Sequence, residues 1–242
     1  ILGFYKLNMI KIMVMKLCVF PNDPITAYYE KGEIKENYFN PENIFDEVHI
    51  ISFFENDIEE FKVQKIVGNA KLKIHSVGKI NIKNRKKEIA KIIEIVKRIA
   101  PDVIRTYNPL IEGWCASFIA KKLNIPCFVS LHTQYDHNRQ LMKKTNLKKY
   151  FVLKYTEKFI EPYILQNASK ITIVYKIIDS YVSKHTNNKP ELLYNKVDCK
   201  KFYNSNEIKG LPKPLILSVG NLIESKNHKL LIESMKKIDA NL

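Results

Sequence analysis

The chain has 242 residues, 45% of them hydrophobic, which allows one large domain or two small ones with a sizeable core. No apolar run is long enough for a membrane-spanning helix, and three lysines interrupt the apolar residues before Phe20, unlike in a secretory signal. The four cysteines lack paired spacing, which argues against a disulfide framework or a zinc site and favours reduced thiols in the cytoplasm: Cys18, Cys115, Cys127 and Cys199.

The formal net charge of +15 is typical of proteins with anionic partners, either nucleic acid or a membrane surface. The sequence has no pattern of a nucleic-acid-binding module, so we expect no nucleic-acid partner. Between Leu141 and Phe151, four lysines alternate with apolar and aromatic residues, as in a helix on the anionic inner face of a membrane: Lys143, Lys144, Lys148 and Lys149. A lysine-rich composition throughout the chain explains the same charge without any partner, and both interpretations stay open.

Strands and helices are predicted to alternate along most of the chain. Apolar, β-rich runs indicate strands at 10–20, 47–52, 72–76, 102–106, 127–131, 170–174 and 191–193. Helical spacing indicates helices at 89–100, 111–123, 147–167 and 177–184. We expect Asn124 to cap the second helix and Pro162 to break the third, while 28–43 is a loop with one helical turn. This order favours an α/β fold with a doubly wound parallel sheet.

A second α/β domain is predicted to open near the end of the chain. Residues 214–219 have the composition of a buried strand, followed by Gly220, a polar loop and an amphipathic helix. One strand and one helix cannot bury a core, so we expect this domain to be truncated. The expected organisation is a complete domain at 1–194, a linker at 195–213 and the start of a second domain at 214–242.

The loop before this last helix is a candidate phosphate site. A helix N-terminus offers free N–H groups to a phosphate, and Lys226 lies at that end and adds a positive charge. A tight turn closed by Gly220, with Lys226 in solvent, explains the same residues.

The segment "SVGNLIESKNHKLLIES" resembles the opening of the nucleotide-binding domain of family 4 glycosyltransferases, which are retaining enzymes of the GT-B fold. The resemblance implies a Rossmann-like domain and assigns Gly220, Asn221 and Lys226 to donor binding. The family's arginine is replaced by Asn221, so one of the two charges that grip the donor diphosphate is absent.

Two upstream segments resemble the same family. The segment "LLYNKVDCKKFYN" is similar to its interdomain signature, and "PDVIRTYNPLIEGWCASFIAKKLNIPCFVSLHTQYD" is similar to its acceptor domain. The resemblance implies that His132, at the end of the strand 127–131, faces the donor sugar and assists catalysis. By its chemistry alone, this histidine is equally a hydrogen-bond donor, an acceptor, a metal ligand or a group satisfied by nearby backbone.

Other polar groups are weaker candidates. Asn22 and Asp23 follow the first strand and are acceptor-side candidates that hydrogen-bond sugar hydroxyls, although a Pro-Asp turn explains them as well. Asp136 and His137 lie close to His132, but on a predicted loop without the spacing of a known metal site, so we expect no metal. The acidic run at 57–60 is expected to be solvated surface.

The resulting expectation is a cytoplasmic glycosyltransferase, inactive as this fragment, that transfers a sugar from a nucleotide-sugar donor to a sugar or lipid-linked acceptor with retention. Metal and other cofactors are not expected from the resemblance. Two alternatives stay open: a non-catalytic α/β module that binds a membrane surface or a partner subunit, and a sugar-nucleotide epimerase of the GT-B fold.

Overall fold

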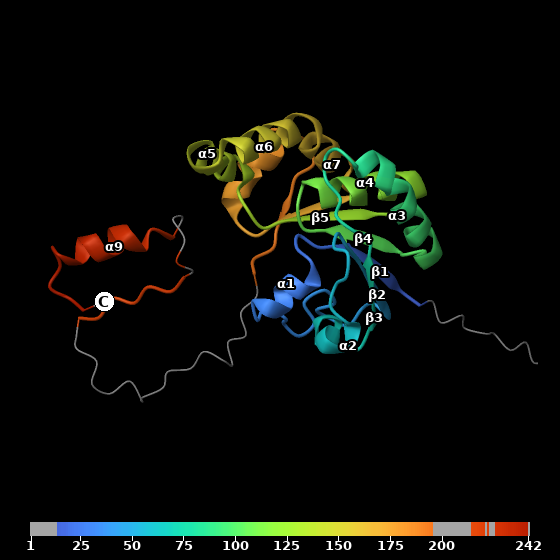
Figure 1. Ribbon diagram of the computed structural model, residues 1–242, viewed down its shortest axis with the longest axis horizontal. Helices are drawn as coiled ribbons and strands as arrows, with labels where there is room; N and C mark the ends of the chain where they lie inside the picture. The colour runs from blue at the N-terminus through green and yellow to red at the C-terminus, as the bar shows by residue number, and fades with distance from the viewer. Residues whose placement is uncertain (1–13, 196–213, 221, 223–225, 242) are drawn as a thin grey trace, which may run out of the picture. The chain divides into compact units, whose positions relative to one another are not determined.

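The computed structural model describes residues 14–195, 214–220, 222 and 226–241 (Figure 1). They belong to two compact units, 1–195 and 196–242, which are described separately below. Among the described residues, no helix combines the length and the apolar character needed to cross a bilayer.

The first unit is built on a parallel sheet of seven strands in the order β3-β2-β1-β4-β5-β6-β7 (Figure 1). Every neighbouring pair of strands is parallel. The strands are β1 Lys16–Phe20, β2 Glu47–Ser52, β3 Lys71–Ser76, β4 Val103–Thr106, β5 Cys127–Leu131, β6 Lys170–Ile173 and β7 Glu191–Leu192. The chain therefore winds from β1 to β3 in one direction and then returns past β1 to build β4 to β7 in the other.

Helices cover the two faces of this sheet. On one face, Leu17 and Val19 of β1 pack with residues of α1 (Ile25–Glu30), α2 (Glu60–Val63) and the 3₁₀ helix η1 (Gln64–Val67). On the other face, Cys18 and Phe20 belong to a core with helices that follow β3, β4, β5 and β6. The helices after β3 are α3 Arg85–Ile99, α4 Ile111–Leu123, α5 Tyr135–Thr145, α6 Leu147–Phe159, α7 Glu161–Asn167, η2 Lys176–Ile178 and α8 Asp179–Ser183. Successive side chains of β1 point to opposite faces, and Leu17 to Phe20 are all buried, so both faces are apolar, as doubly wound sheets require.

The predicted doubly wound Rossmann-like fold is confirmed. β2, β5 and α4 have the predicted bounds, and Asn124 caps α4 in the left-handed conformation, with φ of 56°. The predicted helix at 147–167 is divided at Ile160, with Pro162 in the first turn of α7. The prediction that Asp136 and His137 lie on a loop is wrong, because the Gln134 side chain accepts hydrogen bonds from the Asp136 and His137 amides and so starts helix α5.

The second unit contains one described helix, α9 His228–Met235, where the sequence predicts it. The predicted buried strand at 214–219 is not formed. Leu215 makes only an isolated bridge with Asn241, and the Leu217 and Val219 side chains are 82% and 87% exposed. A strand needs neighbouring strands to bury its side chains, and the described residues of this unit supply none. The predicted linker lies largely outside the described residues.

Candidate functional site

The site candidates gather at the carboxyl edge of the sheet, where β1 and β4 are neighbours. The connection after β1 leads to α1 on one face, whereas the connection after β4 leads to α4 on the other. Such a topological switch opens a crevice beyond the strand ends, which is the usual ligand site of open α/β sheets. Asn22 and Asp23 border it after β1, Asn108 follows β4, and His132 follows β5.

The turn after β4 is fixed by Asn108, which is 5% exposed. Its side-chain oxygen accepts a hydrogen bond from the Leu110 amide at 2.9 Å, and its amide donates to the Glu112 carboxylate at 3.2 Å. The helix α4 begins so close to this turn that a Cβ on Gly113 would lie 2.1 Å from the Asn108 carbonyl oxygen. Only glycine at 113 therefore permits this path of the chain.

Glu112 is a functional candidate that our sequence reasoning missed. Burial raises the pKa of its carboxyl, although hydrogen bonds from backbone and from Asn108 lower it in part. The negative charge of Asp23 adds to the rise. The residue also lines a pocket of about 530 Å³ with mainly apolar walls, formed by Ile80, Asn81, Ile82, Lys83, Leu110, Ile111, Val152, Leu153 and Thr156. The signal for this carboxyl was a lone acid at the start of an otherwise apolar helical run.

His132 is partly buried on the same side of the sheet as Arg105 and Tyr107. Its ring centroid lies 5.6 Å from that of Tyr107, and the Arg105 guanidinium lies 4.7 Å above the Tyr107 ring. Burial, and then the positive charge of Arg105, lower the pKa of His132. Its imidazole is therefore neutral at pH 7, with one nitrogen that donates and one that accepts.

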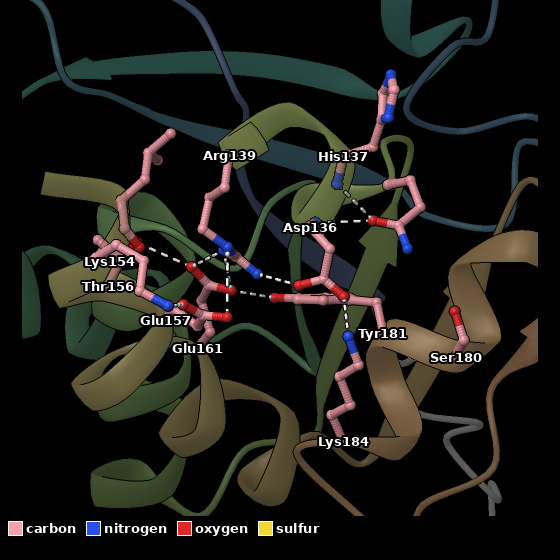
Figure 2. A network of polar contacts seen from close by, with 12 residues as sticks. Asp136, His137, Arg139, Lys154, Thr156, Glu157, Glu161, Ser180, Tyr181 and Lys184 are labelled. Atoms are coloured by element: carbon pink, nitrogen blue, oxygen red, sulfur yellow. Dashed lines mark hydrogen bonds and ion pairs between the residues drawn. The ribbon is translucent and has the colours of Figure 1, made fainter. Parts of the chain in front are cut away.

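A buried polar network holds the segment that follows His132 (Figure 2). Glu161 is fully buried and accepts hydrogen bonds from Arg139, Thr156 and Tyr181 at 2.6 to 2.9 Å. Arg139 also contacts Asp136 at 2.7 Å. The network joins α5 to α6, α7 and α8, and so fixes the direction in which the chain leaves β5.

Asp136 and His137, the two residues that were weighed as metal ligands, have other surroundings. Asp136 lies in the first turn of α5, not on a loop, where it pairs with Arg139 and Lys184. The His137 side chain is exposed. The described residues contain no group of three potential ligands that could hold a metal ion.

The acceptor-side candidates Asn22 and Asp23 are both exposed at the end of β1. The Asp23 carboxylate lies 3.4 Å from the Lys31 ammonium. The acidic run downstream is not simple solvated surface, because Asp57 accepts hydrogen bonds from the amides of Ile25 and Thr26 and so caps α1. These contacts fix the chain immediately after Asp23.

The donor-side candidates lie in the second unit. Gly220 and Lys226 are both exposed, and a Cβ on Gly220 would lie 3.5 Å from Cγ of Lys226, so these two residues lie close together just before α9. Asn221 lies outside the described residues. Donor binding by these residues stays a prediction.

No protein-family model and no curated protein matches this sequence. Among solved structures, the chain is similar to the apo form of the lipopolysaccharide outer core galactosyltransferase WaaB, with 15% identity and a TM-score of 0.50. That likeness covers 76% of this chain and 46% of the galactosyltransferase. The chain is also similar to MurG of Acinetobacter baumannii, with 8% identity and a TM-score of 0.46 over 93% of this chain and 58% of MurG. A third structure is a putative UDP-N-acetylglucosamine 2-epimerase of Listeria monocytogenes, with 10% identity and a TM-score of 0.46 over 72% of this chain and 42% of the epimerase.

The likeness to the galactosyltransferase shows the fold. The first unit has the Rossmann-like architecture of GT-B proteins, as the sequence resemblance implied. The chain spans less than half the length of that structure, so the activity, substrates and partners of the whole protein are treated as proposals.

Proposed function

We propose that this chain is the acceptor-side part of a retaining GT-B glycosyltransferase of family 4. The observation that carries the proposal is the position of His132. Its neutral imidazole lies at the carboxyl end of β5, beside the crevice between β1 and β4, in a sheet with the GT-B architecture. There it acts on the donor sugar, as a hydrogen-bond partner of the group that reacts.

The donor is a nucleotide sugar whose diphosphate is held by the turn from Gly220 to Lys226. The proximity of these two residues at the start of α9 supports this assignment. Asn221 contributes a polar side chain where the family has an arginine. Lys226 then supplies the positive charge, and neither metal nor another cofactor is needed.

The acceptor binds to the first unit. Asn22 and Asp23 hydrogen-bond its hydroxyls, and Glu112 accepts the hydrogen bond of a further hydroxyl at the edge of the pocket that it lines. The mainly apolar pocket beside Glu112 suits the lipid part of a lipid-linked acceptor. One wall of that pocket is α6, through Val152 and Leu153.

The outer surface of α6 supports contact with a membrane. Its exposed apolar side chains include Leu147, Phe151 and Phe159, which are 60%, 67% and 55% exposed. Lys148 and Lys149 flank them, and Lys143 and Lys144 end the neighbouring helix α5, beyond a break at Asn146. Apolar groups beside lysines are what an anionic lipid surface binds, so the protein docks reversibly on the inner face of the membrane.

The test uses the complete product of the reading frame that contains these residues. We expect it to transfer label from a panel of nucleotide sugars to lipid-linked or free sugar acceptors, with release of the nucleoside diphosphate. Nuclear magnetic resonance of the product should show the anomeric configuration of the donor. Epimerisation of the sugar without any acceptor, whether the sugar stays on the nucleotide or is released by hydrolysis, would instead assign an epimerase, and no turnover of any nucleotide sugar would favour a non-catalytic module.

A further inference from the structure

Arg105 is a partly buried charge without a carboxylate partner. It lies next to the carboxyl end of β4, where its Nε donates to the Ser130 hydroxyl at 3.2 Å. No carboxylate among the described residues lies within ion-pair distance of it. Arg139, by contrast, is surrounded by three carboxylates. Partial burial of a guanidinium without a carboxylate partner costs free energy. A charged group of this kind at a strand end beside a crevice indicates a binding site for an anion.

The surroundings fix the plane of this guanidinium. The Arg105 guanidinium lies 4.7 Å from the centre of the Tyr107 ring. The Ser130 hydroxyl, which accepts the hydrogen bond of the Arg105 Nε, is itself held in place by a hydrogen bond from the Thr172 hydroxyl. The two terminal nitrogens have no hydrogen-bond partner among the described residues. A guanidinium held in this way presents a fork of donors that matches a carboxylate or a phosphate.

Neighbouring groups extend the same site. Parallel register pairs Arg105 with Phe128, so Ser130 and then His132 follow on the same face of the sheet. Tyr38 stacks on Tyr107, with ring centroids 6.1 Å apart, and forms the opposite border. The helices of this face, α1 and α2, pack over β1 to β3, and Phe128 of β5 remains 38% exposed. The guanidinium is therefore approachable from the side of β5 and β6.

We propose that the Arg105 guanidinium forms a subsite for an oxyanion, a phosphate or a carboxylate, carried by the acceptor, and that the neighbouring His132 ring senses its charge. The subsite rests on the proposed transferase and specifies its acceptor as an acidic molecule. The diphosphate site proposed at Lys226 belongs to the other unit, and different variants test the two proposals.

The test measures binding of three sugars to the 242-residue chain by nuclear magnetic resonance of the His132 ring. Glucose 6-phosphate and glucuronate carry the two candidate anions, and glucose is the neutral control. We expect saturable binding of at least one charged sugar, with an upward shift of the His132 titration midpoint, and no response to glucose. Preference for one charged sugar identifies the anion.

Variants assign the effect to the guanidinium. Arg105→Gln should weaken binding by about 10-fold or more, the scale of charge-assisted hydrogen bonds, and Arg105→Lys by less. The matched control is Arg98→Gln, an exposed arginine on α3, which should bind as the wild type does. Dispersed amide spectra of each variant verify folding.

Several results would overturn the subsite. These are an equal response to glucose, unchanged binding by Arg105→Gln, equal loss in Arg98→Gln, and tighter binding of UDP than of either charged sugar through Arg105. Tighter binding of UDP would mean that Arg105 binds the phosphate of the donor and not an anion of the acceptor. Sugar transfer by the complete protein at an undiminished rate with Arg105→Gln would remove the subsite and leave the transferase intact.

Discussion

Arg139 on α5 and Glu161 on α7 form a buried ion pair in which one guanidinium nitrogen lies 2.9 Å from both carboxylate oxygens (Figure 2). The two side chains are 4% and 0% exposed. The pair connects the helix that follows His132 to the helix that precedes β6. It therefore stabilises both the fold and the geometry of the candidate site.

Replacing Arg139 by Met should lower the free energy of unfolding by about 3–5 kcal/mol, because the Glu161 carboxylate stays buried without its cation. Urea unfolding measures this loss. Arg139→Met combined with Glu161→Gln should recover part of it, since no buried charge then remains. The control is Lys97→Met, which breaks an exposed pair of equal length with Glu94 and should change stability little. Equal losses in the two single variants would contradict a special role of the buried pair.

His132→Ala should lower the turnover of the complete transferase by about 100-fold or more, because a positioned polar group contributes on this scale. Its thermal unfolding midpoint should change little, since the ring makes no hydrogen bond within the described residues. His137→Ala, an exposed histidine five residues further on, is the matched control and should keep full activity. Wild-type turnover of His132→Ala would return this residue to a structural role.

Lys226→Ala should weaken nucleotide-sugar binding to the complete protein by roughly 1.5–3 kcal/mol, the scale of a charge-assisted hydrogen bond. Asn221→Arg should strengthen binding by adding a second cation near the diphosphate. Isothermal titration calorimetry measures both effects, with Lys236→Ala beyond the end of α9 as the control. If the affinity is the same in all four proteins, the turn does not hold the donor.

The stability of the first unit should fall between pH 6.5 and pH 4. His49 and His75 on neighbouring strands lie 3.0 Å apart, and burial, followed by the charge on His49, lowers the pKa of His75 to about 4. The unfolded chain, with an ordinary histidine pKa near 6.5, binds more protons in this range. The stabilisation is therefore complete above about pH 6.5 and is lost as the pH falls toward 4.

Urea unfolding at pH 7 and pH 5 covers the range in which a histidine with an ordinary pKa gains its proton. We expect a loss of about 1 kcal/mol, a value reduced from the full linkage because the ring is partly exposed. His75→Gln should show a smaller loss, whereas the exposed His137→Gln should behave as the wild type. A pH dependence unaffected by His75→Gln would exclude the histidine pair as its source.

Co-sedimentation with liposomes tests the membrane contact of α5 and α6. A variant with four lysines changed to Gln should bind anionic liposomes more weakly, because each contributes about 1 kcal/mol near such a surface: Lys143, Lys144, Lys148 and Lys149. Salt should weaken the binding of the wild type. A control with the same change in net charge alters four exposed lysines elsewhere: Lys35, Lys65, Lys71 and Lys122. Equal sedimentation of both variants, or no dependence on lipid charge, would exclude this surface.

The sequence by itself determined the order and type of most elements of the first unit. Apolar runs and helical spacing are local signals, so β2, β5 and α4 were predicted with their bounds, and His132 was placed at a strand end. The beginning of helix α5 was missed because its first turn depends on the Gln134 side chain, a cap outside the common set. The strand at 214–219 was predicted wrongly, because composition does not reveal whether neighbouring strands are present.

Only the tertiary structure decided which distant residues meet. The return of the chain past β1 makes β1 and β4 neighbours, so that burial raises the pKa of Glu112 and the nearby negative charge of Asp23 adds to the rise. Strand register likewise puts Arg105 and His132 on one face, and helix packing joins Arg139 to Glu161. These contacts depend on strand order and burial, and neither is a property of any short segment.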